Sequence, residues 1–343
     1  MDSRERFYCT LTRQPLDYPA TWLGIPDKNA IPGLMKYFGT KTVEEIKTIL
    51  NDDIWPVEVP FNLAPNYHIA GSLNFAKTLG SNDERTLTAP GYFEDFDDPE
   101  DIKLFDWPSP SKCIDTKESL ERVKRLPSNK IRMGMMWSAH FQDACSAFGM
   151  ETALIKMLMN PEMFLAVINR IVDYYLEANA IFYEATKGYL DAVLIGNDFG
   201  SQTGLIVDPE LLRQYVFKGT KKLVDQAKSF GLKVIHHSCG SIYEIIPDLA
   251  EIGVDCIHPI QALAANMEPQ KLKDNFGEDI AFCGGVDAQN LLVNGSPDQV
   301  DSKVTELRRI FPTGLIISPS HEAILPDTRP ENIVALFNAV RKH

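Results

Sequence analysis

The sequence predicts an α/β protein with a (β/α)8 TIM barrel, one domain over residues 1–343 with an N-terminal extension and a long insertion. Short apolar segments alternate with amphipathic ones from about residue 128 onward, which indicates parallel strands with helices outside them. The chain is long enough for eight such units. No glycine-rich phosphate loop follows the first strand, and this favours the barrel over a doubly wound open sheet.

The expected elements follow from two kinds of apolar spacing. A short apolar run bounded by polar residues indicates a strand, and apolar residues three or four apart indicate a helix. Two strands are expected early, at 18–23 and 53–61. In chain order the others are strand 130–138, helices 149–159 and 161–188, strand 190–198, helix 208–231, strand 233–239, helix 242–253, strand 254–260, helix 269–277, strand 280–287, helix 296–311, strand 314–320 and helix 329–343.

Residues 77–127 interrupt this pattern. They are rich in Asp, Pro and Ser and are expected to form an irregular insertion within the barrel. The segment from Phe93 to Trp107 carries aromatic side chains that suit packing on the barrel mouth and covering an apolar ring. We therefore expect the insertion to act as a lid.

The chain carries 34 Lys and Arg against 47 Asp and Glu, a formal net charge of -13. Nucleic acids and anionic membranes bind basic surfaces, so neither is expected as a partner. The N-terminus lacks an apolar signal segment and no run approaches the length of a membrane span, so we expect a cytoplasmic protein. The six cysteines are scattered, which favours free thiols or a metal site over a disulfide framework.

Polar side chains follow the expected strands at their carboxyl ends, where a barrel carries its active site. One polar loop residue says little, because loops are polar in general. The number of such residues at one end of the barrel is more informative. They are His140, Asn197, Asp198, His237, Cys239, His258, Gln261, Asp287, His321 and Glu322.

His237 and Cys239 form a distinctive pair within this set. Side chains alternate along a strand, so these two share a face and His236 points to the other. Imidazole and thiolate are zinc ligands, and a catalytic zinc has three protein ligands and one open position. His321 or Cys283 is the expected third ligand. A buried histidine beside an apolar cysteine, without metal, explains the spacing equally well.

Four segments of the second half carry a family resemblance. They are GNDFGSQTGLIVDPELLRQYVFKGTKKL, HHSCGSIYEIIPDLAEIGVDCIHPIQ, GEDIAFCGGVDAQNLLVNGSPDQV and GLIISPSHEAILPDTRPENI. In this order and spacing the chain resembles the uroporphyrinogen decarboxylase superfamily over about residues 128–343. The resemblance implies a (β/α)8 barrel.

Two activities occur among proteins of this superfamily. The decarboxylases carry an Arg-Gln-Ala-Gly-Arg-Tyr stretch near the N-terminus, whose basic groups hold the carboxylates of the substrate, and this chain has no such stretch there. The zinc-dependent methyltransferase branch, with methylcobamide:coenzyme M methyltransferase and corrinoid-linked demethylases, carries His-x-Cys at the fifth strand, as His237 and Cys239 do here. The chain is therefore similar to this branch. A decarboxylase, or a barrel without catalysis, is the alternative.

The resemblance implies methyl transfer between a small methylated substrate (a methoxyaromatic first, or a thiol or amine) and a corrinoid carried by a partner protein. Zinc is expected at His237, Cys239 and His321, with Cys283 as the alternative third ligand. The branch has cysteine where this chain has His321, and the exchange makes zinc a stronger Lewis acid. A homodimer is left open. The other expected site residues are Asp198, Gln202 and His258 in catalysis and His140, Asn197, Gln261 and Asp287 in substrate binding.

Overall fold

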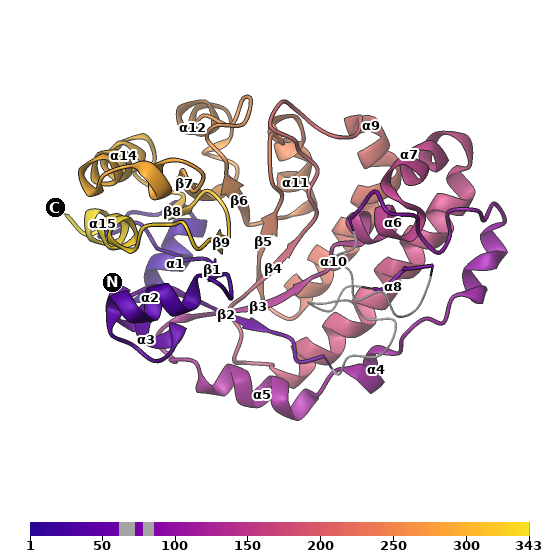
Figure 1. The fold of residues 1–343 in the computed structure, drawn as a ribbon, viewed down its shortest axis with the longest axis horizontal. Coiled ribbons are helices and arrows are strands. Elements are labelled where there is room, and N and C mark those ends of the chain that lie inside the picture. The colour runs from indigo at the N-terminus through magenta and orange to yellow at the C-terminus, as the bar shows by residue number, and fades with distance from the viewer. Residues whose placement is uncertain (62–72, 78–85, 343) are drawn as a thin grey trace.

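The computed structural model describes residues 1–61, 73–77 and 86–342. At its centre is a curled sheet of seven parallel strands in the order of the chain (Figure 1). Parallel strands joined in sequence by helical connections form the expected barrel topology, so the predicted fold class is confirmed. The strands are β2 (Ile54–Glu58), β3 (Ile131–Trp137), β4 (Ala192–Gly196), β5 (Lys233–His237), β6 (Cys256–Ile260), β7 (Ala281–Val286) and β8 (Leu315–Pro319).

Helices cover the outside of the sheet, and their apolar faces pack against outward-facing strand residues. The expected helices are present as α7 (Met150–Met159), α8 (Pro161–Ala185), α10 (Phe217–Ser229), α11 (Ile246–Ile252), α12 (Pro269–Phe276), α14 (Pro297–Ile310) and α15 (Pro330–Val340). The helix expected at 208–231 begins with the short α9 (Pro209–Leu211) and is interrupted before α10. The sequence interpretation missed α1 (Ser3–Leu11), α2 (Ile31–Phe38), α3 (Val43–Leu50), α4 (Pro110–Cys113), α5 (Thr116–Arg125), α6 (His140–Phe148) and α13 (Leu291–Asn294).

Alternate residues of each strand face the barrel interior or the surrounding helices. On β5, Ile235 belongs to the inner core, whereas Val234 belongs to the outer one and His236 stacks on Phe199. This alternation places His237 on the inner face, as predicted. The inner core also contains Met133, Leu194, Cys256, Cys283 and Ile316.

The insertion expected at 77–127 is more regular than predicted. Its residues 78–85 lie outside the described part of the chain. A 3-10 helix occupies Pro99–Leu104, and the stretch ends in the helix α5, which leads into β3. The Asp115 side chain accepts a hydrogen bond from Glu118 N at 2.8 Å and so caps this helix.

The aromatic side chains of the insertion form a small core of their own. Phe93 is fully buried, and its ring centroid lies 6.2 Å from that of Phe148 on α6. The rings of Phe105 and Trp107 are 5.0 Å apart, and the guanidinium of Arg170 on α8 lies 4.7 Å from the Trp107 ring. These rings are therefore engaged in packing. The proposal that they cover a substrate stays a prediction.

The first and last parts of the chain lie side by side, with the indigo N-terminal helices next to the yellow α15 (Figure 1). Ile317 N of β8 donates to Ala20 O at 2.9 Å, and Trp22 N donates to Ile317 O at 3.2 Å. The strand expected at 18–23 is therefore a single bridge to β8. Two short parallel strands extend this contact, β1 (Ile25–Pro26) and β9 (Ala323–Ile324).

On its other side this first segment is held by carboxylates, which explains why the predicted strand is so short. Thr21 N donates to Asp53 Oδ2 at 2.9 Å, and Leu23 N donates to Asp52 Oδ2 at 3.0 Å. Both aspartates are fully buried and immediately precede β2. We call this junction of Thr21 and Leu23 with Asp52 and Asp53 the seam. Side chains, in place of backbone groups of β2, bind these two amides at the seam.

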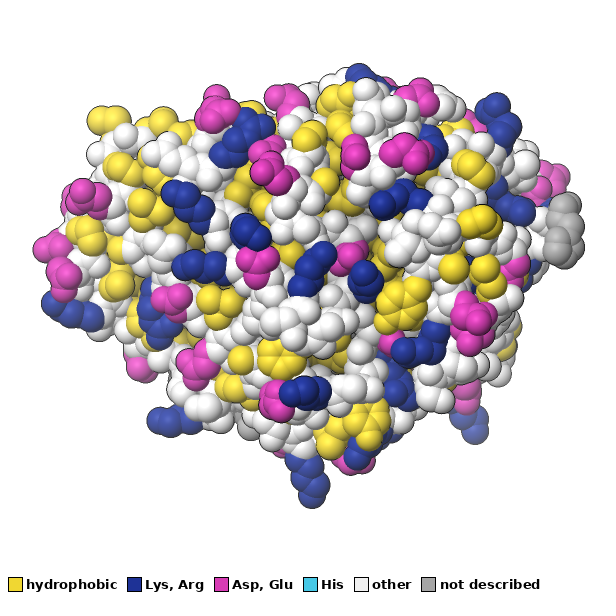
Figure 2. Space-filling view, turned by 180° about the vertical axis from the view of Figure 1, so that it is seen from behind, with side chains coloured by type: hydrophobic (Ala, Val, Ile, Leu, Met, Phe, Trp, Pro, Cys, Tyr) yellow, Lys and Arg dark blue, Asp and Glu magenta, His cyan; other side chains and the backbone are white. Residues whose placement is uncertain are grey.

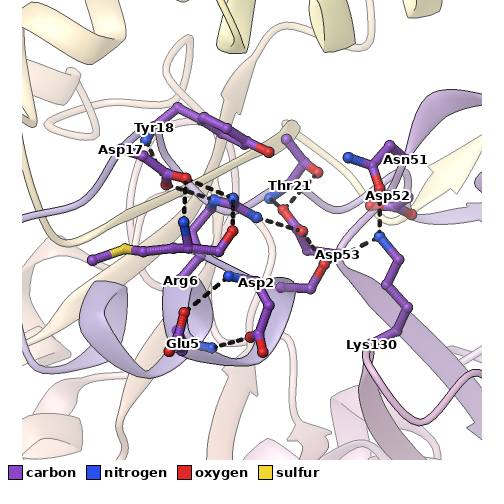
Figure 3. Close-up of polar contacts among 12 residues, drawn as sticks. Asp2, Glu5, Arg6, Asp17, Tyr18, Thr21, Asn51, Asp52, Asp53 and Lys130 are labelled. Carbon is purple, nitrogen blue, oxygen red and sulfur yellow. Dashed lines mark hydrogen bonds and ion pairs between the residues drawn. The ribbon is translucent and has the colours of Figure 1, made fainter.

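Asp53 is also the centre of a buried polar network at the amino ends of the strands (Figure 3). Its Oδ1 accepts from Ser3 Oγ at 2.6 Å and from Arg6 Nη1 at 3.0 Å. Arg6 also donates to both carboxylate oxygens of Asp17, each at 2.9 Å, and Lys130 Nζ donates to Ser3 Oγ at 3.1 Å. The network fastens α1 across this end of the barrel.

Charges of both signs are interspersed on the face of the molecule shown in Figure 2. The net charge of -13 therefore does not form a single acidic patch on this face. In the part of the chain that the structure describes, no helix has the length and apolar character needed to cross a bilayer.

We expect Asp53→Ala to lower the free energy of unfolding by about 3–5 kcal/mol, because the change deprives Arg6 of a buried partner and Thr21 N of its acceptor. Urea unfolding followed by circular dichroism measures the change. Asp225→Ala is the control: its ion pair with Lys221 is more than half exposed, and a loss below about 1 kcal/mol is expected. Equal losses in the two variants would contradict the role given to Asp53.

Candidate metal centre at the carboxyl ends of the strands

The candidate site begins at the end of β5. Val234 and Ile235 are fully buried apolar residues that favour a strand, and Gly240, with φ of +79°, ends the extended chain. His237 is the last residue of the strand and only 5% of its surface is exposed. Cys239 follows two residues later, and its Sγ lies 3.4 Å from His237 Nε2. The two side chains thus lie together, as the alternation of the strand predicts.

His237 is the centre of a cluster of metal-binding atoms. Its Nε2 lies 3.4 Å from Cys239 Sγ and 3.3 Å from Asp198 Oδ1. Its Nδ1 lies 2.9 Å from His258 Nδ1 and 3.6 Å from Glu322 Oε2. The two ring nitrogens therefore face different partners: a thiol and a carboxylate on one side, an imidazole and a second carboxylate on the other.

The loops after β4 and β5 approach each other through glycine backbones. A Cβ at Gly240 would lie 2.5 Å from the carbonyl carbon of Gly200, and a Cβ at Gly200 would lie 2.7 Å from Cys239 O. Glycine at both positions allows this approach. Cys239 N can then donate to Asp198 Oδ1 at 2.8 Å. Backbone contact between the two loops therefore brings Asp198 to Cys239.

Asp198 and His237 shift each other's pKa. Burial raises the pKa of Asp198, but the hydrogen bond to His237 and its charge lower it to about 2 overall. Burial lowers the pKa of His237, but hydrogen bonds to Asp198 and Cys239 and the charge of Glu322 raise it well above the ordinary value of 6.5. A metal ion that binds His237 must displace this proton, because only the neutral imidazole is a ligand.

Two other strand ends supply the remaining members of the cluster. His258 on β6 is fully buried, and burial lowers its pKa well below 6.5, so its ring is neutral. After β8, His321 Nδ1 lies 3.4 Å from Glu322 Oε2 and accepts a hydrogen bond from Ala323 N at 3.0 Å. A hydrogen bond with Cys239 raises the pKa of His321.

The structure brings together five of the expected site residues and adds Glu322. Their ligand atoms form three overlapping groups, and within each group all atoms lie within 4.8 Å of one another. The groups are Asp198, His237 and Cys239; His237, His258 and Glu322; and Cys239, His321 and Glu322. The sequence interpretation placed Glu322 at a strand end but gave it no role, since a single carboxylate beside a histidine has no distinctive spacing.

The sequence interpretation also missed Trp137. The pairing of β3 with β4 shifts between Met135 and Trp137, and the last strand residue and Ser138 have φ of 64° and 54°. This left-handed backbone is costly for a bulky residue, and such strain accumulates at functional sites. It directs the Trp137 ring edge-on toward His237, with centroids 5.4 Å apart. The sequence did offer one indication of this residue: Trp137 is the last residue of the apolar run that forms β3.

His140 and Asn197, expected to bind substrate, are buried and bonded within the protein. Asn197 Oδ1 accepts from Phe141 N at 2.8 Å and so satisfies the first turn of α6. His140 Nδ1 lies 3.2 Å from Ser138 O, and its Nε2 lies 3.3 Å from Val216 O. In a neutral ring one nitrogen donates to its carbonyl, and the other accepts from Asn197 Nδ2 or Thr220 Oγ1, each 3.3 Å away. Both ring nitrogens are therefore engaged within the protein, which favours a structural role.

The same histidine lies at a break in the helix expected at 208–231. The structure has α9, then a π-helical turn at Leu212–Val216, and then α10. His140 Nε2 lies 3.3 Å from Val216 O and 3.3 Å from Thr220 Oγ1. A polar side chain inserted at this point favours the wider turn.

The remaining expected site residues hold loops in place. Gly240 N donates to Gln261 Oε1, which fixes the loop after β5. The Asp287 carboxylate accepts from Leu291 N at 3.0 Å and so closes its own turn before α13. Gln202 is exposed, and its carbonyl oxygen accepts from Ala265 N at 2.9 Å.

Cys283, the alternative third ligand, lies on the inner face of β7. It packs in the inner core with Cys256 of β6 and Ile316 of β8. It is fully buried, and burial raises the pKa of its thiol. Among the described residues it belongs to none of the three groups of ligand atoms. Its position favours a packing role.

The donor set around His237 suits zinc. Tetrahedral zinc binds imidazole nitrogen and thiolate sulfur at about 2.0–2.3 Å, which places neighbouring ligand atoms roughly 3.3–3.6 Å apart. His237 Nε2 and Cys239 Sγ, 3.4 Å apart, meet this spacing. Calcium and magnesium prefer oxygen ligands, so a thiol with an imidazole favours the softer ion.

Comparisons with known proteins agree with the resemblance seen in the sequence. Residues 80–343 match the family described as uroporphyrinogen decarboxylase (URO-D), and the chain belongs to this family. The methylated-thiol–coenzyme M methyltransferase of Methanosarcina mazei is 21% identical over 230 residues, which are 65% of this chain and 57% of that protein. The chain thus spans less than two thirds of this relative. A solved methyltransferase from Methanosarcina mazei has the same fold, with a TM-score of 0.70, 16% identity, and coverage of 99% of this chain and 98% of that one.

We expect His140→Leu to weaken the dependence of stability on pH. Burial lowers the pKa of His140 to about 4 in the folded chain, whereas in the unfolded chain its pKa is about 6.5. The stability that depends on this neutral ring is therefore present above pH 6.5 and falls as the pH drops toward 4, by up to about 1.4 kcal/mol per pH unit. Urea unfolding of both proteins at several pH values in this window measures the slopes. Identical slopes would contradict the assignment.

Proposed function

We propose that this member of the uroporphyrinogen decarboxylase family transfers a methyl group between a small methylated substrate and the corrinoid of a partner protein, with a zinc ion held by His237 and Cys239. The observation that carries the proposal is the position of His237 Nε2 and Cys239 Sγ, 3.4 Å apart at the carboxyl end of β5. The similarity to a methylated-thiol methyltransferase supports the reaction class.

The charges around the site argue against decarboxylation of a polycarboxylate. Asp198 Oδ1 lies 3.3 Å and Glu322 Oε2 lies 3.6 Å from the ring nitrogens of His237. These carboxylates offset the charge of the proposed zinc ion, so the site has no excess of positive charge with which to hold a substrate that carries many carboxylates. A methyl ether, a methylated thiol or a methylamine has no such charge. The geometry therefore favours methyl transfer within this family.

The residues of the site suit the steps of such a transfer. Bound zinc would act as a Lewis acid on the heteroatom that carries the methyl group and would make that atom a better leaving group. The methyl group would pass to the reduced corrinoid, and the heteroatom would keep the bonding electron pair as an anion that the zinc ion stabilises. Glu322 Oε2 is buried without a hydrogen-bond partner among the described residues, which leaves it free to accept a hydrogen bond from a donor group of the substrate.

The purified protein is expected to hold about one zinc ion per chain. His237→Ala and Cys239→Ser should lose the ion, because each change removes a ligand. Elemental analysis after dialysis measures the content. Cys9→Ser is the matched control, since Cys9 is a free, partly exposed thiol on α1, and this variant should keep the ion. Retention of zinc in both ligand variants would rule out the site.

Given a reduced corrinoid protein from the same source, the chain should methylate its corrinoid from a methoxyaromatic, a methylated thiol or a methylamine. The change in corrinoid absorption measures the rate, and His237→Ala should lower it by about 100-fold or more, as loss of an electrostatic catalyst does. Uroporphyrinogen is the contrasting substrate and should release no carbon dioxide. Its decarboxylation, or inactivity with every methyl donor alongside a competent partner, would refute the proposal.

A further inference from the structure

The hydrogen bonds around His237 identify a third ligand for the proposed metal ion. We infer that Asp198 supplies it, so that the ion is held by His237 Nε2, Cys239 Sγ and a carboxylate oxygen of Asp198. The inference rests on the proposed function and concerns the same site. It gives His321, the ligand expected from the sequence, a supporting role.

Asp198 Oδ1 lies at the distance that a shared ion requires. It is 3.3 Å from His237 Nε2, and the ligand atoms of Asp198, His237 and Cys239 all lie within 4.8 Å of one another. Tetrahedral zinc places a ligand nitrogen and oxygen roughly 3.3 Å apart and a nitrogen and sulfur roughly 3.6 Å apart. The three atoms therefore fit around one ion, and the fourth position is left for the substrate.

The second nitrogen of His237 determines which side of the ring can bind the ion. His237 Nδ1 and His258 Nδ1 are 2.9 Å apart, so one of them donates a proton to the other. A histidine that ligates zinc commonly donates its other N–H to a neighbouring acceptor, and this fixes its tautomer and orientation. With Nδ1–H donated to His258, the lone pair of His237 Nε2 faces Cys239 and Asp198.

The hydrogen bonds of His321 disfavour it as a ligand. Ala323 N donates to His321 Nδ1 at 3.0 Å, so the lone pair of that nitrogen is engaged. In a neutral ring the proton then lies on Nε2, which becomes a donor without a lone pair for a metal. His321 is therefore suited to donate a hydrogen bond to the Cys239 thiolate.

Glu322, the other carboxylate near His237, lies on the opposite side of the ring. Its Oε2 is 3.6 Å from His237 Nδ1 and 3.4 Å from His321 Nδ1. An ion bound there through Nδ1 would have to displace the contact with His258. Asp198 is on the Nε2 side, and Cys239 N fixes its carboxylate by a hydrogen bond of 2.8 Å.

The first test compares matched variants by their affinity for Zn²⁺, measured in competition with a chromogenic chelator. Asp198→Asn should weaken binding by about 100-fold or more, because it replaces an anionic ligand by a neutral amide. Glu322→Gln and His321→Gln should weaken it less than Asp198→Asn does, within the roughly 10- to 100-fold expected for groups that support a ligand. A loss in either control variant as large as in Asp198→Asn overturns the inference. Circular dichroism establishes that each variant is folded.

The second test uses the unmodified chain and does not depend on the folding of a variant. The protein is labelled with nitrogen-15 at histidine and loaded with cadmium-113 in place of zinc. Nuclear magnetic resonance should show coupling of the metal to one histidine ring, and coupling to a second histidine overturns the inference. A wild-type chain that takes up neither zinc nor cadmium overturns the proposed metal site itself, so the two failures are distinguishable.

Discussion

The backbone contact between Gly200 and Gly240 sets the relative positions of Asp198 and Cys239 at the candidate metal centre. A side chain at either position would meet backbone atoms of the facing loop at 2.7 Å or less. With the two loops in contact, one hydrogen bond from Cys239 N sets the position of the Asp198 carboxylate. His237 needs no such device, because the strand itself directs its ring inward. The inferred ligand set therefore combines one side chain positioned by a strand with two positioned by loop backbones.

The two ends of the barrel carry buried polar groups of different kinds. At the amino ends, Asp53 is fully satisfied by a serine, an arginine and a backbone amide, and these bonds hold α1 and the first segment in place. At the carboxyl ends, Glu322 Oε2 and His258 Nε2 are buried without hydrogen-bond partners among the described residues. Asp52 Oδ1 at the amino ends also lacks a hydrogen-bond partner among the described residues, so what distinguishes the carboxyl ends is the gathering of imidazole, thiol and carboxylate groups around His237. In barrels of this kind, residues that stabilise the fold lie at the amino ends of the strands and active-site residues lie at the carboxyl ends.

The sequence predicted those features that follow from a regular period. Alternation of strands and helices predicted the barrel, and alternation along β5 placed His237 and Cys239 together. Loop side chains escaped prediction because their direction depends on local hydrogen bonds: Asn197 satisfies a helix start, and Asp287 closes its own turn. The length of the strand expected at 18–23 was overestimated for a related reason. Backbone amides of this segment donate to carboxylates such as Asp53 and not to a neighbouring strand. Strand propensity alone does not show which partner such an amide will have.

The three inferred ligands lie within residues 198–239, just after the two strands of the unit formed by β4, α10 and β5. The seam and the bridge to β8 instead join parts that are far apart in the sequence. Contacts between residues close in sequence form readily, because little chain entropy is lost in bringing them together. In a chain emerging from the ribosome, this unit is complete before β8 has been synthesised. Once β6 has added His258, which orients His237, an ion bound by this unit would stabilise the nascent protein before β8 is made. Zinc supply would then influence the yield of folded protein during translation as well as the reaction of the finished enzyme.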